Sequence, residues 1–380
     1  MAKEKTEPAE KKELSSKDVL NSLMIVNKDY HYNNEPEVDY LVSSGSLNLD
    51  VHLDGGFGPG VHRFCGVTEG GKTSEALEVV KNFLATIPDS KGLLIKAEGR
   101  LTPKMRKRSG IKFVFKAEEW EVGTCFVLET NVYETAVDYM RGLVMYRSKE
   151  KYIFVVDSFD GLIKKDDLAK GSEDANKVAG GAVIASDFLK RVNLALTKRG
   201  HMGIFLSQIR DNIKIDPYAK TSPKIINGSG GNALNHYANY ILEFQPRFNG
   251  DMILPNDKAP VSPTNQAEGH FCKVVIRKSS NEKTLMNLTY PIKYGRVGGS
   301  IWNEKEVVDL LFSWGYMLRK GSWLSPTQDL KDILTKEGFE IFDTIQGEDK
   351  LFKYLMDNPK ILAFLLKMFK EQIQDTSSKE

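Results

Sequence analysis

The chain carries, at residues 66–73, the sequence Gly66-Val67-Thr68-Glu69-Gly70-Gly71-Lys72-Thr73, which matches the phosphate-loop pattern G-x-x-x-x-G-K-[ST] at every fixed position. In such a loop, glycines let backbone N–H groups turn toward a polyphosphate, the lysine reaches the β- and γ-phosphates, and the hydroxyl binds Mg²⁺. A strand-like run at 61–65 precedes the loop and an amphipathic helical pattern at 74–84 follows it, so a positive helix end lies under the phosphates. A chance glycine-rich turn is the alternative. We expect a nucleotide polyphosphate to be bound by Gly66, Thr68, Glu69, Gly70, Gly71, Lys72, Thr73 and Ser74.

The composition is that of an ordinary globular protein. Of the 380 residues, 41% are hydrophobic and 27% are charged, and the net charge is +2, so a nucleic-acid site would depend on local basic clusters. The three cysteines, Cys65, Cys125 and Cys272, are widely spaced, which favours a reducing compartment and argues against a zinc site. No apolar run is long enough to span a bilayer and the charged N-terminus differs from a signal peptide, so we expect a cytoplasmic protein without a membrane partner.

Three regions of the chain differ in pattern. Residues 1–41 hold a charged arm and a short helical pattern at 17–27, which is too short to fold alone and should pack on its own core or on a neighbouring subunit. From 42 to 300, strand-like runs alternate with helical ones, which predicts an α/β domain with a mostly parallel central sheet. Residues 301–380 show short helical pieces without further strand patterns, which predicts a small helix-rich C-terminal domain.

The expected strands are short apolar runs. They lie at residues 61–66, 92–96, 124–129, 152–156, 203–206 and 240–244, with antiparallel additions at 271–278 and 284–290. Residues 212–231 contain Pro217, Pro223 and Gly-Ser-Gly-Gly and have almost no periodicity. A loop of this length inside a compact domain is usually functional or disordered.

Three of these strands lead into side chains suited to nucleotide hydrolysis. Asp157 follows the run 152–156, where a carboxylate can hold Mg²⁺ through ordered waters. Glu98 follows the run 92–96, beyond the carboxyl end of a parallel strand, where it can activate water. Gln208 follows the run 203–206, where its amide can bind a γ-phosphate and pass the loss of that phosphate to the following loop. A solvated Glu98 and a Gln208 that only caps its strand are the alternatives.

With these residues in place, the chain resembles the bacterial RecA and phage UvsX strand-exchange recombinases over residues 42–325. A Gln-Ile-Arg segment followed some twenty residues later by Gly-Gly-Asn-Ala-Leu is far more specific than a phosphate loop alone. Residues 307–310 and 321–323 are similar to the C-terminal domain of the family. The other matching segments are Ser43-Ser44-Gly45-Ser46-Leu47-Asn48-Leu49-Asp50, Ala97-Glu98, Val156-Asp157-Ser158, Ser207-Gln208-Ile209-Arg210, Gly230-Gly231-Asn232-Ala233-Leu234, Tyr237-Ala238, Lys273-Val274-Val275 and Tyr294-Gly295.

This resemblance implies a RecA-type phosphate-loop NTPase that uses ATP and Mg²⁺. Lys72 would bind the phosphates, Glu98 would be the water-activating carboxylate and Gln208 would be the γ-phosphate sensor. Thr73 and, through water, Asp157 would hold Mg²⁺.

Further nucleotide contacts follow from the same resemblance. Tyr294 would approach the base. Arg277 and Lys278 lie near the lysines with which the family reaches the ATP of a neighbouring subunit, as cations supplied in trans. Ile276 takes the place of one of those lysines, so Lys278 is the safer assignment as a catalytic residue.

The resemblance also implies two DNA-binding loops, near residues 169–181 and 209–230. Val178 and Ile213 fall where the family places apolar wedges between base triplets, and Gly230 and Gly231 would offer N–H groups at the start of a helix. The partners would be single-stranded DNA, homologous duplex DNA, further copies of the chain in a helical filament, and possible single-strand-binding or loader proteins. The residues implied in DNA contact are Val178, Ser186, Lys190, Arg210, Ile213, Gly230, Gly231 and Asn232.

Several positions depart from the family. Thr102 and Met105 replace an Asp and a Tyr that touch adenine, which puts base selectivity in doubt. Asn235-His236 replaces a Lys-Phe pair, which puts the usual coupling between subunits in doubt, and Val183 replaces an arginine near the first DNA loop. These departures suggest a divergent member, such as one carried by a phage or a plasmid.

Two basic clusters have more than one interpretation. The run at 104–108 is more typical of a solvated helix face than of a DNA contact. Arg319 and Lys320 beside Trp323 are equally consistent with an ordinary surface and with a C-terminal domain that gathers duplex DNA.

The leading hypothesis is an ATP-dependent DNA recombinase that forms helical filaments on single-stranded DNA and catalyses homologous pairing and strand exchange in recombination and repair. DNA would be held through its backbone, so its affinity should fall steeply with salt and depend little on sequence. Two alternatives remain open: a ring-forming hexameric helicase or translocase with the same core, and a filament-forming mediator that uses ATP only as a switch.

Overall fold

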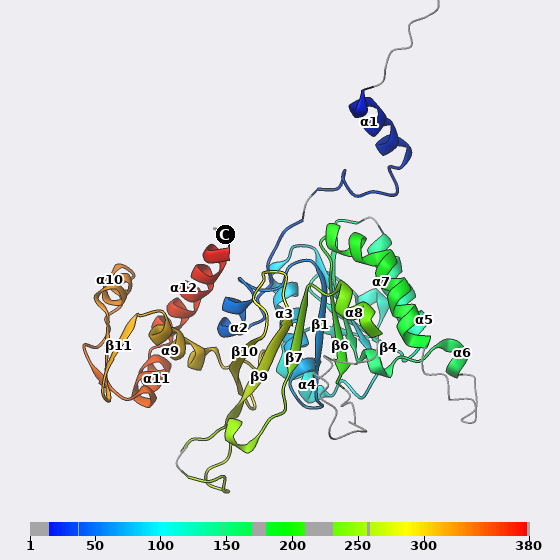
Figure 1. Cartoon of the computed structure of the whole chain (residues 1–380). Helices are drawn as coiled ribbons and strands as arrows, with labels where there is room; N and C mark the ends of the chain where they lie inside the picture. The colour runs from blue at the N-terminus through cyan, green and yellow to red at the C-terminus, as the bar shows by residue number, and fades with distance from the viewer. Residues whose placement is uncertain are drawn as a thin grey trace, which may run out of the picture.

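The computed structural model describes residues 15–36, 38–146, 148–168, 180–209, 231–256 and 259–377, and for 180–184, 231–232 and 376–377 it describes the backbone alone. The chain forms an α/β body, a C-terminal region beside one edge of its sheet, and a helix that stands away from both (Figure 1).

The body is built on a ten-stranded sheet, counted over the described residues, in the order β10-β9-β7-β1-β6-β5-β2-β4-β3, with β8 paired to β9. The strands from β7 to β3 are parallel, whereas β8, β9 and β10 are antiparallel additions. The predicted α/β fold with a mostly parallel sheet is confirmed. The strands are β1 (Gly60–Gly66), β2 (Ser90–Lys96), β3 (Phe113–Val114), β4 (Cys125–Glu129), β5 (Lys151–Asp157), β6 (Met202–Gln208), β7 (Tyr240–Phe244), β8 (Met252–Ile253), β9 (Gly269–Lys278) and β10 (Met286–Lys293).

Helices cover both faces of the sheet, which explains why its central strands are buried along most of their length and are largely apolar. On one face, Phe64, Val155 and Leu206 pack with α3 (Lys72–Thr86), and the short α4 (Pro103–Ser109) lies beside α3. On the other face, Val156 and Phe205 pack with α5 (Tyr133–Met145), α7 (Gly180–Lys198) and α8 (Gly231–Tyr237). Two separate hydrophobic cores therefore hold the sheet in place.

The C-terminal region has its own core but shares one helix with the body. Leu47 of α2 (Leu47–His52) packs into the C-terminal core, whereas Leu49 of the same helix packs under the sheet. The elements of this region are α9 (Asn303–Ser313), β11 (Met317–Lys320), β12 (Trp323–Pro326), α10 (Gln328–Lys336), β13 (Ile345–Gln346), α11 (Glu348–Asp357) and α12 (Pro359–Ser377). The sequence showed no strand pattern here, and the expectation of a region without strands was wrong, because β11, β12 and β13 form a small antiparallel sheet.

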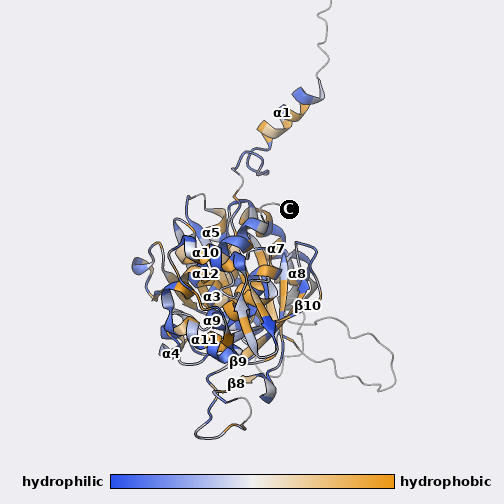
Figure 2. Cartoon of the chain, turned by 90° about the vertical axis from the view of Figure 1, so that its left-hand side faces the viewer, coloured by the Kyte–Doolittle hydropathy of each residue, from blue (hydrophilic) through white to orange (hydrophobic). Residues whose placement is uncertain are grey.

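The N-terminal helix α1 (Ser16–Val26) buries none of its residues. Its start is well defined, because Ser15 and Asp18 form a capping box in which each side chain accepts from the backbone N–H of the other. The connector after it is anchored to the body, where Arg199 pairs with Glu35 and lies over the ring of Tyr32. The helix itself stands away from the body and exposes apolar residues, among them Leu20 and Leu23 (Figure 2).

The predicted and observed boundaries differ by a few residues at most. The largest difference is at β10, where the predicted 284–290 corresponds to Met286–Lys293. The two-residue strands β3 and β8 were not predicted. No helix in the described part of the chain is long and apolar enough to cross a membrane.

Candidate functional site

The phosphate loop joins β1 to α3 as its sequence predicts. Gly66 has a φ of 141°, and a Cβ there would lie 2.2 Å from the carbonyl oxygen of Phe244, so only glycine fits. α3 begins at Lys72, directly after the loop, with its positive end toward the loop. The Lys72 ammonium donates to the carbonyls of Gly66 at 2.9 Å and Val67 at 2.6 Å. Burial lowers the pKa of Lys72, while nearby Asp157 and Glu98 act in the opposite direction.

Thr73 and Asp157 meet on the metal side of this loop. The Thr73 hydroxyl donates to Oδ2 of Asp157 at 3.3 Å. Hydroxyl and carboxylate oxygens suit a hard cation such as Mg²⁺, which completes its shell with waters and substrate phosphates. No cluster of three or more His, Cys, Asp or Glu side chains that would hold a metal by itself occurs among the described residues. The two residues thus fit Mg²⁺ bound together with a nucleotide.

Glu98 and Gln208 come together at the same edge of the sheet. The Gln208 side-chain amide donates to Oε2 of Glu98 at 3.4 Å. β6, β5 and β2 are consecutive neighbours in the sheet, so their carboxyl ends present Gln208, Asp157 and Glu98 side by side. The backbone N–H groups of Ala97 and Glu98 both donate to the carbonyl of Asp157, which holds Glu98 close to β5.

Two residues of this site were missed by sequence reasoning. Asp160 accepts the backbone N–H of Gln208 at 2.6 Å and so fixes the end of β6. A Cβ at Gly161 would lie 2.4 Å from Cγ of Glu98, so glycine leaves the room that the Glu98 side chain occupies. Both follow closely after Asp157, and this proximity in sequence was the only available signal.

A third missed residue, Arg63, links the strand before the phosphate loop to α8. Arg63 is fully buried on β1. Its guanidinium donates to the hydroxyl of Ser207 at 3.0 Å and to the side-chain oxygen of Asn235. Asn235, one of the departures from the family, therefore has a partner within the chain.

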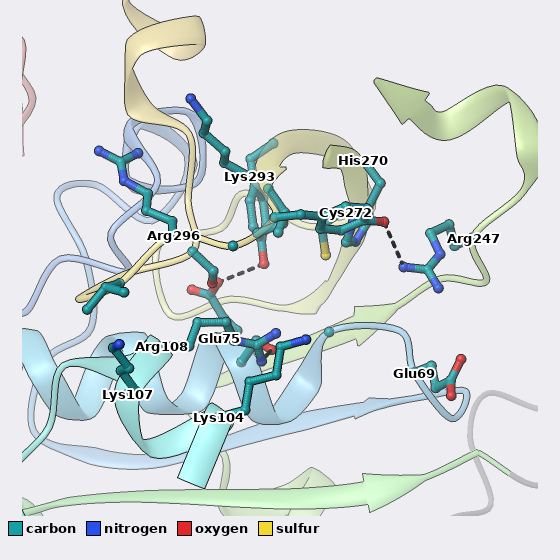
Figure 3. Close-up of a pocket in the computed structure, with 18 residues that line it drawn as sticks. Glu69, Glu75, Lys104, Lys107, Arg108, Arg247, His270, Cys272, Lys293 and Arg296 are labelled. Carbon is teal, nitrogen blue, oxygen red and sulfur yellow. Dashed lines mark hydrogen bonds between the residues drawn. The ribbon is translucent and has the colours of Figure 1, made fainter. Parts of the chain in front are cut away.

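A cavity of about 400 Å³ opens beside the phosphate loop, between α4 and the ends of β9 and β10 (Figure 3). Tyr294 lines it, and Arg247 donates to the Tyr294 hydroxyl at 3.4 Å. Tyr290 donates to Glu75 at 2.7 Å, and burial raises the pKa of both groups. Among its described lining residues, six are basic: Lys104, Lys107, Arg108, Arg247, Lys293 and Arg296.

The two departures expected near the base, Thr102 and Met105, do not line this cavity. Thr102 is the N-cap of α4 and accepts the N–H of Met105 at 3.2 Å. Met105 packs against the core beneath the sheet. The basic run at 104–108 forms α4 itself, and Arg108 donates to Ser74 at 2.8 Å.

Arg277 and Lys278 are both engaged within the chain. Arg277 pairs with Glu243 at 2.5 Å, and this hydrogen-bonded pairing raises the pKa of Arg277. Lys278 donates to the carbonyls of Asn235 and His236 at the end of α8, at 3.0 and 2.8 Å. A role for Arg277 or Lys278 at the nucleotide of a neighbouring subunit stays a prediction.

The predicted DNA-contact residues lie only partly within the described structure. Ser186 is half-buried and Lys190 exposed on α7. Gly231 is the first residue of α8, and for Asn232 the backbone alone is described. The remaining four, Val178, Arg210, Ile213 and Gly230, lie outside the described residues.

Several known proteins are similar to this chain. A family model described as "RecA N-terminal domain" matches residues 21–259. Protein RecA of Nostoc punctiforme is 26% identical over 335 residues, which cover 87% of this chain and 80% of that protein. Protein RecA of Mycobacterium avium is 26% identical over 335 residues, with 88% and 83% covered, and that of Aquifex pyrophilus is 25% identical over 335 residues, with 87% and 82% covered. A solved structure titled "Crystal structure of the RadB recombinase" has a TM-score of 0.44 and 17% identity, over 67% of this chain and 96% of its own.

Proposed function

Because this chain belongs to the RecA family of recombinases, we propose that it is an ATP-dependent DNA recombinase, which forms helical filaments on single-stranded DNA and catalyses homologous pairing and strand exchange. Membership of this family supports a role in DNA recombination and repair and a nucleotide-hydrolysing activity. DNA dependence, filament assembly and strand exchange are the finer parts of the proposal.

The contact between Glu98 and Gln208 carries the proposal. A carboxylate and an amide meet at 3.4 Å beside a phosphate loop, as hydrolysis of a γ-phosphate with an attached sensor requires. Gln208 is the last residue of β6, and the proposed second DNA loop begins at the next residue, Ile209. A change in the hydrogen bonds of Gln208 on loss of the γ-phosphate would thus reach this loop directly.

The chain's own residues divide the work of hydrolysis. Thr73 and Asp157 would hold Mg²⁺ together with ATP, and the metal would neutralise charge on the transferred phosphoryl group. Lys72 would exchange the loop carbonyls that it now contacts for phosphate oxygens, and Glu98 would accept a proton from the attacking water. Asp160 would keep Gln208 in place.

Self-association is supported by the exposed apolar side of α1. Leu20 and Leu23 are more than half exposed, and no residue of α1 is buried in the described structure. Docking of this helix on the next copy of the chain would repeat without closing, which produces a helical filament. Arg277 and Lys278 would then leave Glu243 and the end of α8 to reach the neighbouring nucleotide.

We propose for residues 301–380 a role in gathering duplex DNA. β11 and β12 form a hairpin on which Arg319, Lys320 and Trp323 are exposed. One of these cations is already paired, because Arg319 contacts Glu348. We further propose that residues 1–41 serve assembly and residues 42–300 bind ATP and single-stranded DNA.

Electron microscopy with single-stranded DNA and a non-hydrolysable ATP analogue tests this function. Open helical filaments are expected, together with an ATPase rate that rises on addition of single-stranded DNA and strand exchange between homologous DNAs. Closed hexamers that unwind DNA would support the helicase alternative instead. Filaments whose DNA functions survive complete loss of turnover in Glu98→Gln would support the mediator.

A further inference from the structure

Lys96 lies on the metal side of the phosphate site, and no role described above uses it. It is the last residue of β2, and its register partner in the parallel strand β5 is Asp157. The Lys96 ammonium lies 2.5 Å from Oδ2 of Asp157, and the two side chains are only 9% and 10% exposed. This is a nearly buried ion pair within the candidate site.

The same carboxylate oxygen also accepts the hydroxyl of Thr73 at 3.3 Å. Thr73 and Asp157 are the two side chains that phosphate-loop chemistry assigns to Mg²⁺. A fixed ammonium group therefore lies beside the place where a divalent cation would bind. Two cations at one carboxylate repel each other, and burial reduces the screening of that repulsion by water.

We propose that Lys96 is a tethered cation that competes with Mg²⁺ for Asp157 and so sets the metal requirement of nucleotide binding. Without metal, Lys96 neutralises a carboxylate whose burial alone would be unfavourable. With Mg²⁺ and a triphosphate bound, Lys96 would give up Oδ2 of Asp157, and the phosphate charge would offset its ammonium. The inference rests on the proposed use of ATP and Mg²⁺ at this site.

Lys91, at the other end of β2, provides a matched control. It pairs with Glu150 at 2.9 Å and lies over the ring of Trp120, far along the strand from Asp157. Lys91→Met removes a cation from the same strand and leaves the site unchanged. Lys96→Arg keeps a positive charge at the site itself.

The test measures binding of a fluorescent, non-hydrolysable ATP analogue in EDTA and across a Mg²⁺ titration. In Lys96→Met, we expect the half-saturating Mg²⁺ concentration to fall at least about fivefold, because the competing charge is gone. Affinity for the analogue in EDTA should instead weaken at least about threefold, because a cation near the phosphates is lost. Lys91→Met and Lys96→Arg should behave like the native chain in both conditions.

An unchanged Mg²⁺ midpoint in Lys96→Met would overturn the inference, as would a loss of affinity in both conditions, which indicates only damage to the site. If Lys96→Met fails to fold, Lys96→Gln gives the same comparison, because its amide keeps a donor toward Asp157 without the charge. A melting curve that matches that of the native chain would show that this variant is folded. A native chain that binds no analogue in either condition would overturn the proposed function as well. Native binding with Mg²⁺, together with identical midpoints in all variants, would overturn the role of Lys96 alone.

Discussion

Single side chains at the carboxyl edge of the sheet decide the proposed chemistry, and Glu98 is the first of them. Its carboxylate accepts a hydrogen bond from the Gln208 side-chain amide at 3.4 Å, and Gly161 leaves it room. Glu98→Gln should lower kcat for ATP hydrolysis by about 100-fold or more, because a general base contributes roughly 10²–10⁴. The affinity for ATP, measured by equilibrium binding, should change little, since Lys72 and the loop remain.

The control for Glu98 is Glu129→Gln, which removes an exposed carboxylate at the end of the adjacent strand β4. This variant should keep the native rate. A Glu98→Gln enzyme with an undiminished rate would show that another group activates the water.

His201 gives a residue-scale prediction on stability. Its Nδ1 accepts the N–H of Tyr152 at 3.1 Å, and burial, aided by Lys151 and Arg199, lowers its pKa from 6.5 to about 3. Below pH 6.5, His201 therefore becomes protonated in the unfolded chain but stays neutral in the folded chain. The contribution of His201 to the free energy of unfolding is fully present above this pH and falls as the pH drops toward 3. Between pH 7 and pH 5 this one group should remove about 2 kcal/mol of the free energy of unfolding.

The variant His201→Asn tests this assignment, because its amide oxygen can accept the same N–H without titrating. Its free energy of unfolding, from denaturant titrations, should lose about 2 kcal/mol less than that of the native chain between pH 7 and pH 5. The comparison with the native chain cancels the effect of His62, which is also buried and has a pKa lowered to about 4. Equal losses in both proteins would contradict the assignment.

At the scale of elements, Glu306 of α9 joins the C-terminal region to the body. Its carboxylate accepts the Ser46 hydroxyl at 2.5 Å and the backbone N–H groups of Leu47 and Asn48 at 3.1 and 3.2 Å, at the start of α2. Burial raises the pKa of Glu306. The side chain thus satisfies the exposed N–H groups of one helix from another element.

Glu306→Ala should lower the free energy of unfolding by about 2–4 kcal/mol, because several buried donors lose their acceptor. Hydrogen exchange should quicken most at α2 and α9, where the contact is lost. Glu306→Gln keeps the shape and part of the hydrogen bonding, so its loss should be smaller. An alanine variant with native stability would show that the two regions hold together without this contact.

How far elements and site follow from the sequence depends on what each one contacts. Strands buried on both faces are largely apolar, which is why β5 and β6 were predicted to within two residues, whereas β1, which contains Arg63, was placed by the phosphate loop that follows it. The hairpin of β11 and β12 is mostly exposed and buries only a few side chains such as Met317 and Leu324, so it shows no apolar run.

The same distinction applies to the site. Glu98, Asp157 and Gln208 could be proposed because each follows a recognisable strand. Lys96 could not, because its pairing with Asp157 depends on the register between β2 and β5, which no local pattern reveals.

At the scale of the whole molecule, α1 is the element whose apolar side has no partner in the described structure. Leu20 and Leu23 are 58% and 54% exposed and lie on one side of the helix. Burial of one such leucine contributes about 1.5–3 kcal/mol, so replacing both with aspartate should weaken docking on another copy by at least about 100-fold. Filament length in electron micrographs and sedimentation velocity with nucleotide would measure this loss.

The paired control is Asn21→Asp, which adds a charge to the same helix at a position that is already polar. This variant should assemble as the native chain does. Binding of the ATP analogue by the double variant in its monomeric form should match that of the native chain, because α1 lies away from the phosphate loop (Figure 1). DNA-stimulated hydrolysis should fall together with assembly if cations of one copy complete the site of the next. Persistence of DNA-stimulated hydrolysis in a strictly monomeric variant would separate catalysis from assembly and remove Arg277 and Lys278 from the catalytic set.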